Sequence, residues 1–176
     1  MQRIHWACLV GLIVVILFVV GCTKSPTGSI VIDTTKKPPV EAGTTFRSVP
    51  GDVCMEGGKP VVRLFATTWC PHCQWVKPGF SEVVREYQDA GKIVGHLWEM
   101  DVGDDALTPE KEAAVPDSEL AIFKQFNSKG SVPTFVFGCT RVRIGNAYEA
   151  EDDLEKEKAE FRGAIEQLLK TEMVTA

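Results

Sequence analysis

Basic residues are few in this sequence relative to acidic ones. It holds 19 Lys and Arg against 24 Asp and Glu, which gives a net charge of −5 at pH 7. A nucleic-acid-binding domain normally carries a basic stripe that neutralises phosphates, and this sequence has none. A shortage of apolar residues, as in disordered chains, is also missing, because 44% of the residues are hydrophobic. The 176 residues therefore predict one packed domain with appendages and no nucleic-acid partner.

Cysteine is scarce as well. Six cysteines are too few for a chain held together by disulfides alone, but they suffice for one redox site and one structural bridge. The single CxxC pair, Cys70 and Cys73, lacks the second close pair that a structural zinc site usually needs, and His72 would complete only three ligands. We expect no metal and no cofactor other than a redox-active Cys70–Cys73 disulfide.

Long apolar runs are absent except near the N-terminus. Residues 6–20 are apolar or glycine and follow Arg3. A run of about 15 residues is short for a hydrocarbon core ~30 Å thick, so residues 1–21 are predicted to be a signal peptide. The segment Val-Val-Gly-Cys at its end resembles the bacterial lipobox, which makes Cys22 the expected lipidation site. An uncleaved signal anchor is the alternative, and both options place the rest of the chain on the extracytoplasmic face of the cell membrane, in the periplasm or at the cell surface.

The segment 22–45 is rich in Thr, Pro, Lys, Gly and Ser and is predicted to be a flexible tether to the membrane. The folded domain is expected over residues 46–176. Its hydrophobic patterns predict an α/β fold with a mixed sheet and helices on both faces. The predicted strands cover 61–66, 93–102, 132–137 and 141–144, and the predicted helices cover 71–89, 118–128 and 152–170.

The segment TTWCPHC stands where a predicted strand ends and a predicted helix begins. A cysteine at a helix N-terminus faces unpaired N–H groups and the positive end of the helix dipole, which stabilise a thiolate. Cys70 is therefore the expected nucleophile, and Cys73, one turn further, is placed to resolve a mixed disulfide. Pro71 suits the first helical position. His72 can add positive charge or a hydrogen bond to the thiolate, which would make the disulfide more oxidising.

Three features together resemble the thioredoxin superfamily: the strand–WCxxC–helix context, Pro78 five residues after the second cysteine, and Ser-Val-Pro-Thr at the start of a late strand. The resemblance covers about residues 59–170. It implies a thioredoxin-like three-layer α/β/α sandwich with four or five strands and protein thiol–disulfide oxidoreductase activity. It also implies that Trp69 faces the substrate and that Pro133 is a cis-proline exposing the backbone of Val132 to an extended substrate segment. A trans-proline at the start of an edge strand is the alternative.

The direction of electron flow is less clearly indicated. The Cys-Pro-His-Cys segment and the valine before Pro133 resemble DsbA-type oxidases, but the chain is too short for the helical insertion of those enzymes. Leu64 stands where reducing thioredoxins carry a buried aspartate. We expect an oxidase or isomerase; the alternatives are a reductase, for example in cytochrome maturation, and a non-enzymatic metal- or partner-binding lipoprotein. The expected partners are protein thiol or disulfide substrates, a membrane or periplasmic redox partner, and the membrane itself.

The resemblance also positions two further cysteines. In a thioredoxin-like sheet the strand that starts at Pro133 runs antiparallel to the strand before Cys70. Cys139 should therefore lie beside the start of that strand, close to Cys54, and we expect a structural disulfide between them. Two free thiols, or a second exchange-active pair, are the alternatives. The acidic stretch 103–117 is expected on the active-site side, either as a solvated loop or as a charged surface that selects partners.

Overall fold

The computed structural model describes residues 44–175. The signal peptide predicted over residues 1–21, the lipidation site predicted at Cys22 and nearly all of the tether predicted over residues 22–45 lie outside the described residues. These three features therefore stay predictions. Within the described part of the chain, no helix is both long enough and apolar enough to cross a membrane.

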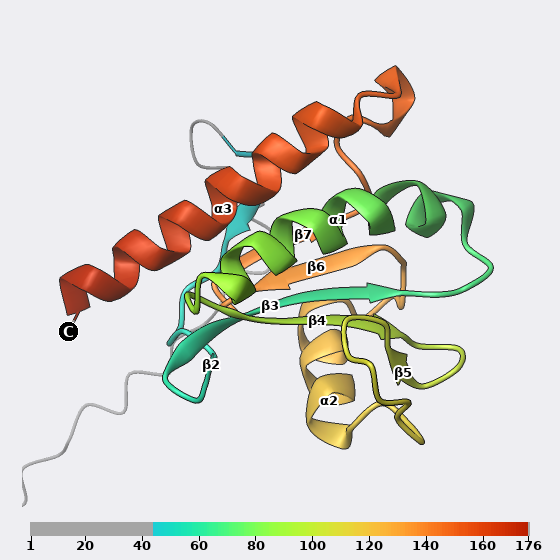
Figure 1. The fold of residues 1–176 in the computed structure, drawn as a ribbon, viewed down its shortest axis with the longest axis horizontal. Coiled ribbons are helices and arrows are strands. Elements are labelled where there is room, and N and C mark those ends of the chain that lie inside the picture. The colour runs from blue at the N-terminus through green and yellow to red at the C-terminus, as the bar shows by residue number, and fades with distance from the viewer. Residues whose placement is uncertain (1–43, 176) are drawn as a thin grey trace, which may run out of the picture. The chain divides into compact units, whose positions relative to one another are not determined.

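Two parallel strands form the centre of a mixed sheet (Figure 1). β3 (Lys59–Ala66) is buried at every position but its first, and β4 (Val94–Glu99) pairs with it. Near-continuous apolar runs are typical of strands covered on both faces. The other described strands, all in antiparallel pairs, are β1 (Arg47–Ser48), β2 (Met55–Glu56), β5 (Asp104–Asp105), β6 (Thr134–Phe137) and β7 (Arg141–Ile144). The strand order is β1-β7-β6-β3-β4-β5, with β2 paired to β3 off this path.

The described sheet has seven strands rather than the four or five expected. The four predicted strands are present as β3, β4, β6 and β7. The additional strands β1, β2 and β5 have two residues each, which is too short to show an alternating pattern in the sequence. The strand predicted over residues 93–102 ends at Glu99, because the backbone N–H groups of Val102 and Gly103 turn back to the Glu99 carbonyl.

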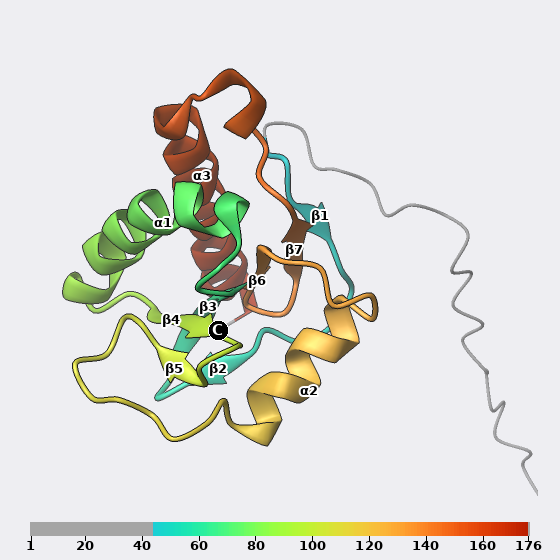
Figure 2. The ribbon, with the colours of Figure 1, turned by 90° about the vertical axis from the view of Figure 1, so that its right-hand side faces the viewer.

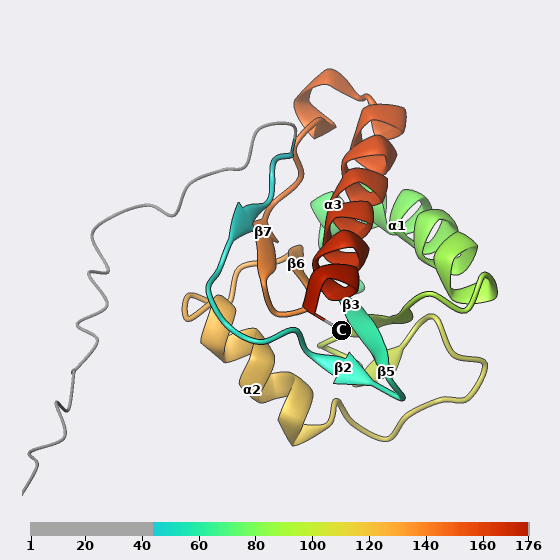
Figure 3. The same ribbon diagram turned by 90° about the vertical axis from the view of Figure 1, so that its left-hand side faces the viewer.

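Helices cover both faces of the sheet, as Figures 2 and 3 show. α1 (Pro71–Asp89) and α3 (Leu154–Thr175) lie on one face, and α2 (Asp117–Phe126) lies on the other. The short 3₁₀ helix η1 (Glu149–Glu151) precedes α3. The sequence predicts the last helix from residue 152, but Asp152 has a φ of 49°, in the left-handed region, and the helix begins two residues later. The predicted α/β fold class with a mixed sheet is confirmed.

Alternating side chains of β3 divide the core into two apolar clusters. Val62, Leu64 and Ala66 face α1 and α3, where five phenylalanine rings pack with centroid separations of 4.6–6.4 Å. These rings belong to Phe46, Phe80, Phe135, Phe137 and Phe161. Phe65 faces α2 instead and contacts Phe123, with ring centroids 5.1 Å apart. Each helix layer is thus held by its own buried face.

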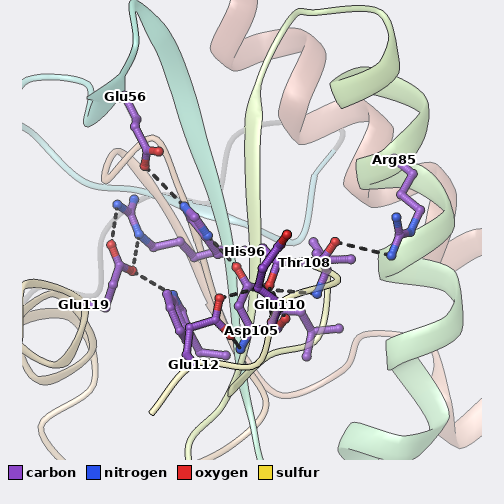
Figure 4. A network of polar contacts seen from close by, with 12 residues as sticks. Glu56, Arg85, His96, Asp105, Thr108, Glu110, Glu112 and Glu119 are labelled. Carbon is purple, nitrogen blue, oxygen red and sulfur yellow. Dashed lines mark hydrogen bonds and ion pairs between the residues drawn. The ribbon is translucent and has the colours of Figure 1, made fainter. Parts of the chain in front are cut away.

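A buried ion pair adds a polar anchor on the α2 face of the sheet (Figure 4). Arg63 of β3 donates two hydrogen bonds to the Glu119 carboxylate of α2, at 2.6 and 2.9 Å. Trp98 of β4 donates its indole N–H to the same carboxylate at 3.2 Å. A buried charge needs such pairing, because an unpaired one would be strongly destabilising. The carboxylate therefore ties α2 to both central strands.

The acidic stretch 103–117 is not simply a solvated loop. The Asp105 side chain is buried. Its carboxylate accepts a hydrogen bond from the Leu97 backbone N–H at 2.8 Å and lies 2.6 Å from Nδ1 of His96 (Figure 4). Burial alone would lower the pKa of His96, but the hydrogen bond and charge of Asp105 outweigh it and raise that pKa. Glu112 accepts the backbone N–H of Asp105 at 2.9 Å. Asp105 therefore holds the stretch to β4, and Glu112 closes a contact within the stretch.

Candidate active site

Cys70 occupies the N-cap position of α1. Its backbone is extended, and its Sγ accepts a hydrogen bond from the backbone N–H of Cys73 at 3.3 Å. The sulfur takes the place of the side-chain oxygen that commonly caps a helix. A thiolate there faces the unpaired N–H groups and the positive end of the helix dipole. Pro71 at the first helical position sacrifices no hydrogen bond, because its missing N–H would be unpaired there anyway.

The two cysteines of the CxxC pair differ in accessibility. Both are free thiols, and Cys70 is 4% exposed whereas Cys73 is fully buried. An incoming disulfide can therefore reach only Cys70 without a change in structure. This difference agrees with the predicted roles of Cys70 as the attacking cysteine and Cys73 as the resolving one.

The segment that contains Pro133 lies directly against Cys70. The peptide bond between Val132 and Pro133 is cis, and the Cys70 Sγ lies 3.9 Å from the Val132 carbonyl oxygen. Trp69, immediately before Cys70, is 71% exposed and is free to contact another molecule through its ring. The structure thus places the Val132–Pro133 segment against Cys70, although more than 60 residues separate them in the sequence. Trp69 directly precedes Cys70 at the same place.

The turn between β3 and Cys70 is fixed by polar contacts from two elements. Asp101, just after β4, accepts hydrogen bonds from the Thr68 backbone N–H at 2.9 Å and from the Thr68 hydroxyl. These hydrogen bonds lower the pKa of Asp101. Gln74 of α1 donates its side-chain amide to the Thr68 carbonyl. The approach to Cys70 is therefore held on both sides.

Burial dominates the chemistry of Cys73. Desolvation and the side-chain hydrogen bond with Cys70 raise the pKa of Cys73 from 9.0 to about 12. Lys77, one turn further along α1, lowers this pKa through its charge, and its Nζ pairs with the Glu99 carboxylate at 2.6 Å. Leu64, fully buried on β3, offers no carboxylate to accept the proton. Cys73 is thus a neutral thiol over the physiological pH range.

Alkaline pH is expected to destabilise the reduced protein through Cys73. The unfolded chain, with a thiol pKa near 9.0, loses its proton before the folded chain, with a pKa of about 12. The stabilisation is therefore complete below about pH 9 and is lost as the pH rises towards 12. One pKa unit corresponds to about 1.4 kcal/mol, so the free energy of unfolding should fall by roughly 2 kcal/mol from pH 9 to about pH 10.5.

Urea denaturation of the reduced chain at these two pH values measures this loss. The Cys73→Ser variant is the matched control, because it removes the buried thiol and leaves Cys70 and Tyr87 in place. Tyr87, whose pKa is raised to about 12 by burial and by its hydrogen bond with Glu166, contributes equally to both chains. Equal alkaline losses in the two chains would contradict the assignment to Cys73.

His72 contacts a carboxylate and not the Cys70 sulfur. Its Nδ1 lies 2.8 and 2.9 Å from the two carboxylate oxygens of Glu149, which is 77 positions further along the chain. Among the hydrogen bonds of the described residues, none joins the His72 ring to Cys70. Of the two expected ways in which His72 could assist the thiolate, the hydrogen bond is not among the described contacts, and the contribution of its charge stays a prediction. Glu149 and its neighbour Asn146 carry no motif that would have identified them beforehand.

No protein-family model matches this chain. The thioredoxin of Geodia cydonium is 27% identical to it over 88 residues, which are 50% of this chain and 76% of that protein. This similarity supports a thioredoxin-like relationship. Taken with the fold and with the Cys70–Cys73 geometry, it supports a general thiol–disulfide redox function.

A second cysteine pair lies at the far end of β3 from this thioredoxin-like site. Cys54 and Cys139 form a disulfide with a Cα–Cα distance of 5.4 Å. The Cys54 backbone N–H donates to the Gly138 carbonyl at 3.0 Å, and its carbonyl accepts the Val61 N–H at the start of the strand. Cys139 has a φ of 59°, in the left-handed region. Since Cys70 follows the opposite end of β3, this disulfide cannot exchange directly with it.

The described part of the chain contains no candidate metal-binding site. Within residues 44–175, no group of three or more His, Cys, Asp or Glu side chains is placed to hold a metal ion. His96, the histidine of the acidic network, is occupied by Asp105 and Glu56.

Proposed function

We propose that this protein is a membrane-tethered, extracytoplasmic thiol–disulfide oxidoreductase that exchanges disulfides with protein substrates through Cys70 and Cys73. The observation that carries the proposal is the position of the Cys70 sulfur. It caps α1, accepts the Cys73 backbone N–H at 3.3 Å, and lies 3.9 Å from the carbonyl of Val132 beside the cis-proline. Such a site combines a stabilised thiolate with a buried second thiol and an exposed aromatic residue, Trp69.

The proposed exchange proceeds in two balanced steps. In the reducing direction, the Cys70 thiolate attacks one sulfur of a substrate disulfide, and the other substrate sulfur leaves as a thiolate. Cys73 then loses its proton and attacks the Cys70 sulfur, which forms the Cys70–Cys73 disulfide and releases the second substrate thiolate. Two electrons pass to the substrate. The same steps in reverse oxidise a substrate dithiol.

The oxidase or isomerase direction is favoured by two features of the site. The Cys-Pro-His-Cys segment resembles DsbA-type oxidases, and Leu64 replaces the buried aspartate of reducing thioredoxins. One observation favours a reductase, as in cytochrome maturation: the His72 ring contacts the Glu149 carboxylate and not the Cys70 sulfur. The reduction potential decides between the two directions.

Localisation is the second part of the proposal. We propose that residues 1–21 are a signal peptide, that Cys22 is acylated, and that residues 22–45 tether a domain spanning residues 46–176. A membrane or periplasmic redox partner would then restore the resting state of Cys70–Cys73. Mass spectrometry of the mature N-terminus in a bacterial host tests this part, since an acylated Cys22 and an uncleaved Met1 give different masses.

Catalysed exchange with a disulfide-bonded reporter peptide tests the function. The full chain in detergent should catalyse the exchange, and Cys70→Ser should reduce it to the uncatalysed rate. A non-enzymatic binding protein would show no catalysis in either chain and would retain metal through a chelator wash. Titration against glutathione then gives the direction: about −120 to −180 mV indicates an oxidase or isomerase, and about −270 mV or lower indicates a reductase.

A further inference from the structure

We infer that Glu149 is a positioning residue that lowers the reduction potential of the Cys70–Cys73 pair by holding His72. The inference rests on the proposed redox function and adds a residue to it. Glu149 lies on η1, 77 positions beyond His72, and its two carboxylate oxygens lie 2.8 and 2.9 Å from the His72 Nδ1. The ring between the two cysteines is therefore already occupied by a carboxylate.

Asn146 strengthens this contact by binding both partners. Its side-chain amide donates to the His72 carbonyl at 2.9 Å and to the Glu149 carboxylate at 2.8 Å. The histidine is thus held at its backbone and at its ring by neighbouring residues of the same loop. The Glu149 side chain is 29% exposed, against 66% for His72, so the loop contributes the more buried partner.

The loop that carries Glu149, residues 145–153, is itself anchored next to the active site. The Gly145 backbone N–H donates to the carbonyl of Pro133 at 2.9 Å. The indole N–H of Trp75 in α1 donates to Asp152 at 2.9 Å. In Figure 1 this loop and the start of α3 lie beside the start of α1. The two contacts connect the loop to the cis-proline segment and to the helix that Cys70 caps.

A buried carboxylate of α3 also holds the loop 145–153. Glu157 of α3 is fully buried and accepts the backbone N–H groups of Ala147 at 3.0 Å and Tyr148 at 3.1 Å. It also pairs with Arg143 of β7, whose guanidinium lies among three phenylalanine rings. These contacts fix the backbone immediately before Glu149. The backbone that carries the Glu149 carboxylate is therefore fixed by hydrogen bonds next to His72.

The electrostatic consequence concerns the reduced state. A positive imidazolium near Cys70 stabilises its thiolate, and stabilising the reduced form makes a disulfide more oxidising. Glu149 offsets that charge and keeps Nδ1 engaged, so His72 cannot turn this nitrogen towards the sulfur. When the carboxylate is replaced by an amide, the negative charge beside the His72 ring is removed, and a Cys70 thiolate forms without that charge nearby. The reduced form then becomes more stable, and the potential rises.

The test compares the glutathione equilibrium of the full chain with that of four variants: Glu149→Gln, Glu151→Gln, His72→Gln and the double variant His72→Gln/Glu149→Gln. Glu149→Gln should shift the equilibrium about tenfold towards the dithiol, which corresponds to about 30 mV. Glu151→Gln is the matched control, because Glu151 lies on the same turn but pairs with Lys156 at 3.5 Å instead of His72. Its equilibrium should stay within about twofold of the wild type. Adding Glu149→Gln to a His72→Gln chain should change the equilibrium less than threefold.

Three results would overturn the inference: a Glu149→Gln shift no larger than that of Glu151→Gln, a shift towards the disulfide, or a full shift in the His72→Gln chain. Each of these leaves the redox function intact, because the wild type still equilibrates with glutathione and catalyses exchange. Failure of the proposed function differs: the wild-type chain would form no Cys70–Cys73 disulfide at any glutathione ratio. A potential is the readout because a purely structural role of Glu149 would change the unfolding midpoint and leave the potential unchanged.

Discussion

A Cys73→Ser variant is expected to stop at the mixed disulfide with its substrate. Cys70 keeps the cap of α1, since the hydrogen bond to its sulfur comes from the backbone N–H of residue 73 and survives the substitution. A serine hydroxyl does not attack a disulfide, so the second step is lost. Turnover should fall by orders of magnitude, while a covalent complex with the reporter peptide accumulates and disappears on addition of a reductant. Non-reducing gel electrophoresis and intact-mass measurement detect this complex.

The control for this experiment is Cys70→Ser, which should form no complex at all. Release of substrate from Cys73→Ser at the wild-type rate would mean that another thiol resolves the intermediate. The described structure offers no ready candidate, because Cys54 and Cys139 are joined to each other at the other end of β3. Among the described cysteines, Cys73 is therefore the free thiol expected to resolve the intermediate.

Resolution by Cys73 has an energetic cost that the surroundings only partly relieve. Its pKa of about 12 means that the thiol must give up a proton before it attacks. Leu64 provides no carboxylate to accept this proton. The charge of Lys77 lowers the pKa of Cys73, and Lys77 is itself paired with Glu99. We therefore expect Cys73 to stay protonated and unreactive until a mixed disulfide has formed at Cys70.

Much of the fold could be predicted because the long elements carry clear patterns. The buried run of β3 and the periodic apolar face of α1 each span enough residues to show their period. The two-residue strands β1, β2 and β5 do not, and each depends on a partner strand that is distant in sequence or follows a turn. The roles of Asp105 and Glu112 could not be predicted either. An acidic side chain in a polar stretch is expected to be solvated, and only the folded structure shows its hydrogen-bond partners.

The site divides in the same way. Cys70, Cys73 and Pro133 could be named in advance, because a CxxC at a strand–helix junction and a late Val-Pro have a local signature. Glu149 and Asn146 could not, because their relation to His72 exists only after β7 returns the chain to the start of α1. Sequence patterns therefore identify the reacting atoms, whereas the groups that modulate them come from tertiary contacts.

Removing the Cys54–Cys139 disulfide is expected to destabilise the fold without altering the redox site. The bridge joins residues 85 positions apart, and closing a loop of that length is worth roughly 4–5 kcal/mol in the chain-entropy model. The loss should be large because the closed loop contains β3, α1, β4, α2 and β6, so most of the domain gains conformational freedom in the unfolded chain when the bridge is absent. The double variant Cys54→Ala/Cys139→Ala is compared with its parent by urea denaturation without reductant, both chains carrying Cys70→Ser and Cys73→Ser, and the difference in the free energy of unfolding gives the effect of the bridge.

The reduction potential of Cys70–Cys73 in the Cys54→Ala/Cys139→Ala variant, with Cys70 and Cys73 both kept, is the accompanying control. It should equal that of the wild type, because the bridge lies beside the start of β3 and the active site follows the end of that strand. A loss below about 1 kcal/mol would mean that residual structure already restricts this loop in the unfolded chain. A changed potential would contradict the separation of the two pairs, and it would make the bridge a part of the redox chemistry.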